Sequence, residues 1–250
     1  MAGLAKEAAC ARPTAFHTLL GALSRHGVLG RIYTQNIDDL ELKAGLTTVG
    51  DEPNCVQLHG SVMKVQCTQC SYTEHTVHHF RALSSGELPP CPQCQMMIKK
   101  RISDGKRVGS KGGLLRPAII LYRESHPKSE DIESIQSLDR SKADNLLVVG
   151  TSLKTHGSVS LIKTMSTFIK KRKGGVYYLD LASPPKDVKV FDHILQVDCQ
   201  DFAKQALDHL EKSKFTGSAS VDGDRTKTDF ADLVETGRVR KDMRPSWDWA

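Results

Sequence analysis

The chain has 250 residues, of which 39% are hydrophobic and 26% are charged, with a formal net charge of +6 at pH 7. This is an ordinary balance for a globular protein. No apolar run approaches the roughly 20 residues that span a membrane, and residues 1–12 mix charged residues with alanines and lack an apolar signal core. We therefore expect an intracellular protein without a membrane partner, built from one sizeable core with at most a small added module.

The N-terminal part is predicted to contain one helix and two short strands. Thr14 can cap a helix over residues 14–26, and Gly27 can end it. Buried strands are expected at 28–34 and 55–58, and each runs into a polar turn.

Residues 61–114 break this pattern and are expected to form a separate small module. The module holds two Cys-x-x-Cys pairs separated by twenty residues, Cys67 with Cys70 and Cys91 with Cys94. Each pair folds into a turn that aims two sulfurs at one point, so the spacing predicts a tetrahedral zinc site. Four protein ligands leave no open position, and the zinc is therefore expected to be structural. The alternatives are a redox pair, unrelated thiols, or ligation by a histidine between the pairs: His75, His78 or His79.

The positive excess of the chain lies beside the second cysteine pair. Residues 99–116 contain a single acid, Asp104, and seven basic residues, so the rest of the chain is neutral overall: Lys99, Lys100, Arg101, Lys106, Arg107, Lys111 and Arg116. Such a stretch attracts nucleic acid or an acidic partner, or it is a solvated loop.

From residue 114 onward, strands alternate with helices. Strands are expected at 114–122, 145–149 and 176–181, and amphipathic helices at 158–173 and 201–212. Apolar strands that alternate with helices indicate an α/β fold with a parallel, doubly wound, Rossmann-like sheet.

The predicted organisation has three parts. Residues 1–60 and 115–212 form a discontinuous Rossmann-like domain. Residues 61–114 form an inserted zinc-ribbon module with a basic loop, and residues 213–250 form a polar tail that is expected to be disordered.

Polar residues follow four of the expected strands. They stand at 35–38, 59–60, 150–152 and at Asp180. Ligands of open parallel sheets bind beyond the carboxyl ends of the strands. We therefore expect these four strand ends to form a ligand site.

The motifs Thr-Gln-Asn-Ile-Asp at 34–38, His-Gly at 59–60 and Gly-Thr-Ser at 150–152 stand in this order, with the four cysteines between the second and the third. Together they resemble the sirtuins, a family of NAD-dependent protein-lysine deacylases, over roughly residues 1–212. Tyr122, in Ile-Leu-Tyr-x-Glu, leans toward fungal sirtuins that deacetylate core histones. The resemblance implies NAD as co-substrate, one structural zinc, an acetylated lysine peptide or protein such as a histone as partner, and the nucleus as compartment.

At the nicotinamide end, the resemblance assigns residues of the first two strand ends. Asn36 and Asp38 would hold the nicotinamide and its ribose, with Gln35 and Ile37 beside them. His59 would be the general base that takes a proton from a ribose hydroxyl, because histidine titrates near neutral pH. A structural turn residue is the alternative for His59.

At the other end of the cofactor, the resemblance assigns residues of the later strands. Thr151 and Ser152 would bond cofactor oxygens, and Gly150 would permit close approach. Asp180 and Cys199 would lie near the adenosine, although Asp180 stands where the family usually has Asn, and Cys199 could instead be a small core residue.

The sequence departs from the family in two places. Sirtuins begin with a strand and a Gly-Ala-Gly-x-Ser turn, followed by an Asp-Phe-Arg segment, whereas residues 1–17 resemble the sequence just before the family's second strand. The chain is therefore expected to start within the domain, leaving the strands that end at Asn36 and Tyr122 without their shared central neighbour. Arg123 replaces a family glycine and is expected to crowd the groove where the strand 118–122 would pair with the acyl-lysine peptide.

Three functions remain open from the sequence. The first is an NAD-dependent protein-lysine deacetylase that transfers the acetyl group to ADP-ribose and releases nicotinamide. The second is a catalytically inactive sirtuin-like module that binds zinc and peptide, which the missing glycine turn favours. The third is a zinc-ribbon nucleic-acid binder that uses residues 99–116, but it leaves the strand-end motifs unexplained.

Overall fold

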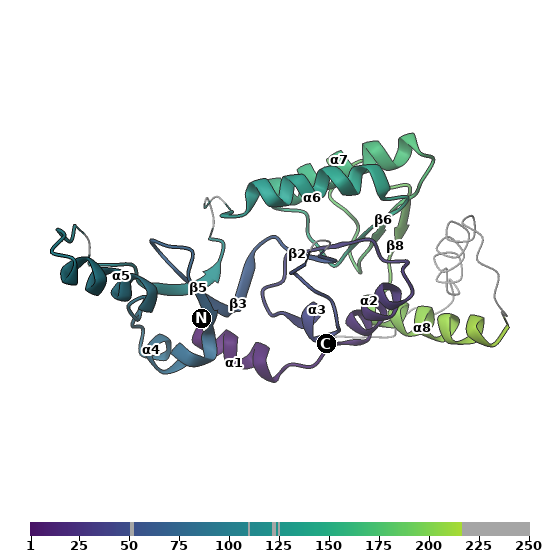
Figure 1. Ribbon diagram of the computed structural model, residues 1–250. Helices are drawn as coiled ribbons and strands as arrows, with labels where there is room; N and C mark the ends of the chain where they lie inside the picture. Colours follow the sequence, from purple (N-terminus) through teal and green to yellow (C-terminus); the bar gives the residue numbers. More distant parts are fainter. Residues whose placement is uncertain (51–52, 110, 122–123, 125, 217–250) are drawn as a thin grey trace. The chain divides into compact units, whose positions relative to one another are not determined.

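A computed structural model describes residues 1–50, 53–109, 111–121, 124 and 126–216 (Figure 1). The chain divides into two compact units, and each is built from two segments. Of the described residues, the first unit comprises those in 1–13 and 31–132, and the second comprises 14–30 and 133–216. The three-part domain division expected from the sequence remains a prediction. Tyr122, Arg123 and residues 217–250 lie outside the described residues.

A pair of parallel strands carries the first two strand-end motifs in the first unit. Strand β1 (Ile32–Thr34) pairs with β2 (Cys55–Gln57), in a register that sets Ile32 opposite Cys55 and Thr34 opposite Gln57. The short helix α3 (Leu40–Lys43) follows the turn after β1. Because the two strands are parallel, their carboxyl ends lie side by side.

The second sheet of this unit is antiparallel, in the order β4 (Thr73–His75), β3 (Gly60–Cys67), β5 (Leu115–Ile119). The expectation that the strand around Pro117 belongs to the parallel sheet is wrong, because β5 pairs antiparallel with β3 from Gly60 to Cys67. The register shifts between Ser61 and Val65, and Pro117 lies opposite Val65 beside this irregularity. Proline has no N–H to donate to the ladder, so a strand tolerates it at an irregularity such as this one.

Helix α1 (Ala2–Cys10), which the sequence analysis did not predict, packs against β3. Its residues Ala5 and Ala8 join a buried cluster with Val62. The ammonium of Lys43 donates to the backbone oxygens of Ala8, Ala9 and Ala11 at 2.7, 2.8 and 2.9 Å. A cation at the C-terminus of a helix satisfies carbonyls that have no helical partner and is favoured by the helix dipole. The remaining helices of the unit belong to the cysteine region: η1 (Thr76–His79), α4 (Phe80–Ser84) and α5 (Pro92–Ser103).

The second unit contains a parallel sheet in the order β6 (Leu146–Val149), β7 (Val176–Leu179), β8 (His193–Leu195). All four residues of β7 are buried. Helices lie on both faces of this sheet: α2 (Ala15–Arg25) and α8 (Cys199–Thr216) on one, and α7 (His156–Lys171) on the other. Helix α6 (Ser129–Lys142) precedes β6.

Alternation along β7 explains the two covered faces. Tyr177 and Leu179 pack with Leu19 of α2 and Phe202 of α8. On the opposite face, Tyr178 packs with Ile162 of α7, in line with the two-residue period of a strand. An α/β fold with parallel strands and helices on both faces is thus confirmed. Among the described residues the parallel strands form a two-stranded and a three-stranded sheet, and no described helix is both long and apolar enough to cross a membrane.

Candidate functional site

The four paired cysteines converge on one point in the first unit. Their sulfurs all lie within 4.8 Å of one another. The Sγ atoms of Cys67 and Cys94 are 3.7 Å apart, and the Sγ of Cys70 is 3.6 Å from those of Cys91 and Cys94. A tetrahedron with Zn–S bonds of about 2.3 Å has edges of about 3.8 Å. The donor set and its spacing therefore fit a structural zinc.

Backbone geometry holds the tetrad in place. The N–H groups of Gln69 and Cys70 donate to the Sγ of Cys67 at 3.3 and 3.4 Å, which closes the first turn. The second pair lies at the start of α5, where Cys91 caps the helix and Pro92 occupies its first turn. Gly113 lies against the tetrad, because an added Cβ would fall 2.3 Å from the Sγ of Cys67.

Burial and hydrogen bonds act differently on the individual thiols of the tetrad. Cys67, Cys91 and Cys94 are buried together with Val65 and Leu115. Burial raises the pKa of the Cys91 thiol. For Cys67, burial is outweighed by donated backbone N–H bonds, which lower the pKa of this thiol to about 7. His79 is hydrogen-bonded to Glu74 at 2.7 Å, so its ring is engaged beside the tetrad rather than in it.

The first strand-end site lies at the carboxyl edge of β1 and β2. Because Thr34 is opposite Gln57, residues 35–38 and His59 follow the adjacent ends of β1 and β2. The side chain of Asn36 is exposed, and those of Gln35 and Asp38 are half-buried. The Asp38 Oδ1 accepts the N–H of Leu40 at 3.2 Å, which turns the loop into α3.

His59 is held by the backbone on either side of it. Its carbonyl oxygen accepts the N–H of Ile120 at 3.0 Å. The next residue, Gly60, has φ +74°, and an added Cβ would fall 2.1 Å from the carbonyl oxygen of Ala118. Only glycine fits this conformation and this close approach. The His-Gly motif therefore turns the chain from β2 into β3 and leaves the half-buried imidazole at the edge of the sheet.

A second histidine, His126, lies close to this edge and was missed by sequence reasoning. Its Nε2–H donates to the carbonyl oxygen of Gln57 at 3.3 Å, and its Nδ1 accepts the N–H of Lys128 at 3.0 Å. Burial lowers the pKa of His126, and the nearby charges of Lys128 and His59 lower it further. The ring is thus held neutral. No local motif marks it, because its partners are backbone atoms.

The second strand-end site lies at the carboxyl edge of the sheet in the second unit. Val149, Leu179 and Leu195 are aligned across β6, β7 and β8, so residues 150–152 and Asp180 leave the sheet at the same level. Gly150 has φ +57°, and its N–H donates to the carbonyl oxygen of Leu179 at 3.1 Å.

Two side chains at this edge accept hydrogen bonds from nearby backbone N–H groups. The Thr151 Oγ1 accepts the N–H of Leu153 at 3.3 Å, and the Asp180 Oδ1 accepts the N–H of Ala182 at 2.9 Å. Ser152 is exposed. Burial, followed by the nearby Asp180, raises the pKa of Tyr178.

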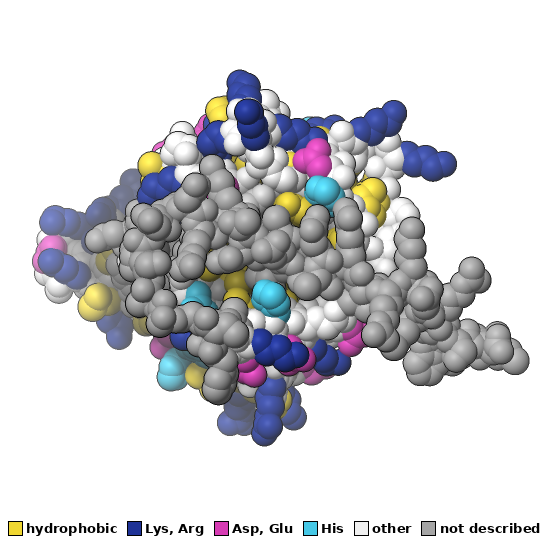
Figure 2. All heavy atoms as spheres, turned by 90° about the vertical axis from the view of Figure 1, so that its right-hand side faces the viewer, with side chains coloured by type: hydrophobic (Ala, Val, Ile, Leu, Met, Phe, Trp, Pro, Cys, Tyr) yellow, Lys and Arg dark blue, Asp and Glu magenta, His cyan; other side chains and the backbone are white. Residues whose placement is uncertain are grey.

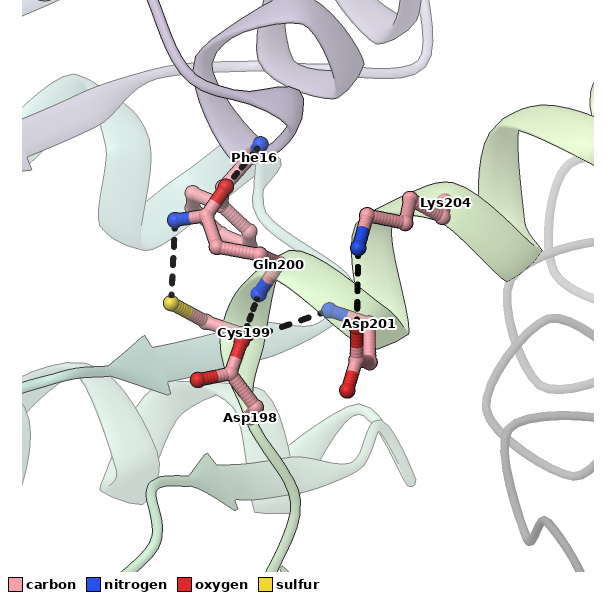
Figure 3. Close-up of polar contacts among 6 residues, drawn as sticks. All are labelled: Phe16, Asp198, Cys199, Gln200, Asp201 and Lys204. Carbon is pink, nitrogen blue, oxygen red and sulfur yellow. Dashed lines mark hydrogen bonds and ion pairs between the residues drawn. The ribbon is translucent and has the colours of Figure 1, made fainter.

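Cys199 stands at the first turn of α8, which Asp198 caps (Figure 3). The Asp198 Oδ1 accepts the N–H groups of Gln200 and Asp201 at 2.7 and 3.3 Å. The Gln200 side chain accepts the N–H of Phe16 at 3.0 Å and donates to the Cys199 sulfur at 3.4 Å. Burial raises the pKa of Cys199, and Asp198 and Asp180 raise it further. The thiol is therefore protonated at neutral pH and partly packed in the core.

The candidate peptide strand is an edge strand. In the sheet order β4-β3-β5, β5 has a strand neighbour on one side only among the described residues. Arg116 on this strand is ion-paired with Glu124, and Glu124 also accepts the N–H of Leu121 at 3.0 Å. These two bonds, first the one from Leu121 and then the one from Arg116, lower the pKa of Glu124. Arg116 therefore links β5 to Glu124 in the segment that follows this strand.

Most of the basic stretch is exposed. Arg116 is engaged by Glu124, whereas the other six basic residues of this stretch lie on the surface. In the view of Figure 2, Lys and Arg side chains project from the surface of the protein. Lys100 and Arg101 occupy the last turn of α5, where the helix dipole favours cations, and Lys106 pairs with Asp104 at 3.3 Å. These local roles account for part of the charge, and nucleic-acid binding stays a prediction.

Three comparisons with known proteins bear on identity. A family model described as Sir2 family matches residues 3–157. The chain belongs to the Sir2 family. It is 36% identical to the NAD-dependent histone deacetylase HST3 of Saccharomyces cerevisiae over 253 residues, which cover 94% of this chain and 54% of that protein. It is 34% identical to the NAD-dependent protein deacylase of Pyrococcus furiosus over 204 residues, covering 81% of this chain and 70% of the relative.

The chain is also similar to a second fungal protein and to a solved structure. The NAD-dependent protein deacetylase hst4 of Emericella nidulans is 35% identical, covering 92% of this chain and 41% of the relative. The chain thus spans about half the length of these fungal relatives. A mutant Sir2 homologue in complex with ADP-ribose has a TM-score of 0.64 at 24% identity, over 87% of this chain and 74% of that one. The chain therefore has the Sir2-type fold. The predicted similarity to fungal members of the family is confirmed by the two fungal relatives.

Proposed function

We propose that this Sir2 chain is an NAD-dependent protein-lysine deacetylase that acts on acetylated proteins, histones among them, in the nucleus. It would transfer the acetyl group from lysine to ADP-ribose and release nicotinamide. Fungal relatives named as NAD-dependent histone or protein deacetylases support the reaction and the substrate class. A structural neighbour described as Sir2 bound to acetylated peptide supports the kind of partner.

The observation that carries this proposal is the register of β1 and β2. Because Thr34 lies opposite Gln57, the loop with Asn36 and the half-buried His59 emerge from adjacent strand ends of one sheet. A group that binds the ribose and a base that accepts a ribose proton must lie this close together.

The residues of the chain divide the work as follows. NAD supplies a ribose whose bond to nicotinamide is broken, and Asn36 and Asp38 would orient that ribose. His59 would accept the proton from its hydroxyl after the acetyl oxygen has displaced nicotinamide. The exposed edge of β5 would pair with the extended peptide through backbone hydrogen bonds. At the other sheet edge, Gly150, Thr151, Ser152 and Asp180 would bind the remainder of the cofactor, with Cys199 beside them.

The test is nicotinamide release from NAD by this chain, with and without an acetyl-lysine peptide. We expect peptide-dependent release, and we expect His59→Ala to reduce it by roughly a hundredfold or more, as loss of a general base does. Zinc content should not change in that variant. His26→Ala, which removes an exposed histidine of the other unit, is the matched control.

Two results would contradict the proposal in different ways. Full turnover by His59→Ala would remove this residue from the mechanism. No release from the folded, zinc-loaded wild type would favour the second candidate, an inactive module that binds zinc and peptide.

A further inference from the structure

The loop that carries Asn36 is tied at both sides to the start of α3. Thr34 and Gln57, which are register partners across β1 and β2, each donate a side-chain hydrogen bond to an acid of that helix start. The Thr34 hydroxyl donates to Glu41 Oε1 at 2.5 Å, and the Gln57 amide donates to Asp39 Oδ1 at 2.6 Å. The two bonds close the turn between strand and helix.

Thr34 also bonds to the loop itself. Its Oγ1 accepts the backbone N–H of Asn36 at 3.1 Å, so one hydroxyl joins the Glu41 carboxylate to the Asn36 backbone. Thr34 is 5% exposed and Glu41 is 3% exposed. Water does not compete at these positions, so the hydrogen bonds there are strong and well oriented.

The second bond is accepted by a residue in a strained conformation. Asp39 has φ +60°, in the left-handed region that few residues other than glycine adopt. The Gln57 amide holds its carboxylate there, and Gln57 stands two residues before His59. The Asn36 loop and the strand that leads to His59 are thereby joined through side chains as well as through the backbone.

Stability alone does not account for an acid at this place. Within the described residues, the Oε2 of Glu41 has no hydrogen-bond partner although it is buried. The two acids also act on their surroundings: burial, followed by Glu41 and Asp39, raises the pKa of Cys55 to about 12. An apolar side chain of similar volume would avoid the cost of desolvating the carboxylate. A buried acid that bonds the Thr34 hydroxyl despite this cost points to a role in orientation.

We propose that Glu41 is a positioning residue for the nicotinamide end of the site. It acts through the Thr34 hydroxyl, which fixes the Asn36 backbone, while the bond between Asp39 and Gln57 ties the same loop to the strand of His59. The inference rests on the proposed function, because it assigns the network to NAD rather than to the peptide.

The test compares Thr34→Val, which keeps the shape and removes the hydroxyl, with Thr34→Ser, which keeps the hydroxyl. Hydrogen exchange of the Asn36 amide should become roughly tenfold faster in Thr34→Val and stay near wild type in Thr34→Ser, because one hydrogen bond is lost. The KM for NAD should rise by a similar factor in Thr34→Val, with the KM for the acetyl-lysine peptide unchanged. Thr18→Val, at an exposed position of α2, is the matched control.

The outcomes separate this inference from the proposed function. If wild type releases no nicotinamide, the function fails, and Asn36 amide exchange still decides whether the network orders the loop. Wild-type exchange at Asn36 and a wild-type KM for NAD in Thr34→Val would overturn the inference. So would a loss of turnover without any change in the KM for NAD, which indicates a merely structural role.

A second variant covers the case in which Thr34→Val does not fold. Gln57→Met removes the donor to Asp39 at a less buried position. It should also raise the KM for NAD, and Gln57→Glu, which places a second carboxylate against Asp39, should raise it further. Unchanged KM values in both Gln57 variants would overturn the inference.

Discussion

The cysteine tetrad and the strand-end residues are two different kinds of site within one chain. All four cysteines belong to one unit, and two local turns bring their sulfurs together. The residues assigned to the cofactor belong to both units and stand at the edges of two parallel sheets. A metal site of the first kind is defined by spacing in the sequence, whereas a strand-end site depends on register and on the neighbours of each strand.

The largest effect is expected from breaking the tetrad. Cys91→Ser should reduce zinc from one ion per chain to almost none and unfold the region around β3, β5 and α5. The binding energy of a structural zinc, about 10–16 kcal/mol in small zinc peptides, is largely folding energy. Zinc analysis and hydrogen exchange over residues 60–119 would measure this. Cys10→Ser, at an exposed cysteine, is the control, and unchanged zinc in Cys91→Ser would rule the tetrad out.

A substitution beside His59 tests the contact between β3 and β5 next to the first strand-end site, without touching a reacting group. Gly60→Ala places a methyl group 2.1 Å from the carbonyl oxygen of Ala118, at φ +74°. We expect a loss of about 2–4 kcal/mol in the free energy of unfolding. Gly30→Ala, where an added Cβ meets nothing within 4 Å, should change it little. Urea unfolding of both variants makes the comparison, and equal midpoints would contradict the described contact between β3 and β5.

The smallest effect concerns the second strand-end site. Asp198→Ala removes the cap of α8 next to Cys199 and should destabilise the second unit by about 1 kcal/mol. Asp201→Ala, which loses an exposed ion pair with Lys204 and an exposed acid of the first helical turn but keeps the cap, should have a smaller effect. Unfolding midpoints by circular dichroism would rank the two, and a larger effect of Asp201→Ala would show that the cap does not stabilise this end.

The sequence could predict the elements whose signals are local. The cysteine spacing anticipates the tetrad, and the apolar runs anticipate β6, β7 and the amphipathic helices α2 and α7. The polar residues after each strand anticipate which side chains stand at the sheet edges. These features depend on residues that are near one another in the chain.

The features that sequence reasoning missed depend on distant partners. The apolar run of β5 gives no sign that its partner is β3 and that the pairing is antiparallel. Helix α1 buries only alanines, which make a weak apolar face, and its end is held by Lys43, more than thirty residues away. His126 is held by backbone atoms that no motif contains, and Glu41 itself lies outside the motif whose Thr34 it contacts. Register and burial in three dimensions decide these contacts, and neither can be read from periodicity.

The pairing of α2 with α8 has a consequence for the order in which the protein can fold. The Phe16 N–H and its acceptor on Gln200 are 184 residues apart, and Leu19 and Leu23 of α2 pack against Phe202 and Ala203. During synthesis, the apolar face of α2 therefore leaves the ribosome long before its partner exists. Contacts of such sequence separation slow folding, and uncovered apolar surface in the waiting chain invites aggregation or capture by chaperones. In the nascent protein, α2 therefore has no packing partner until α8 has been synthesised.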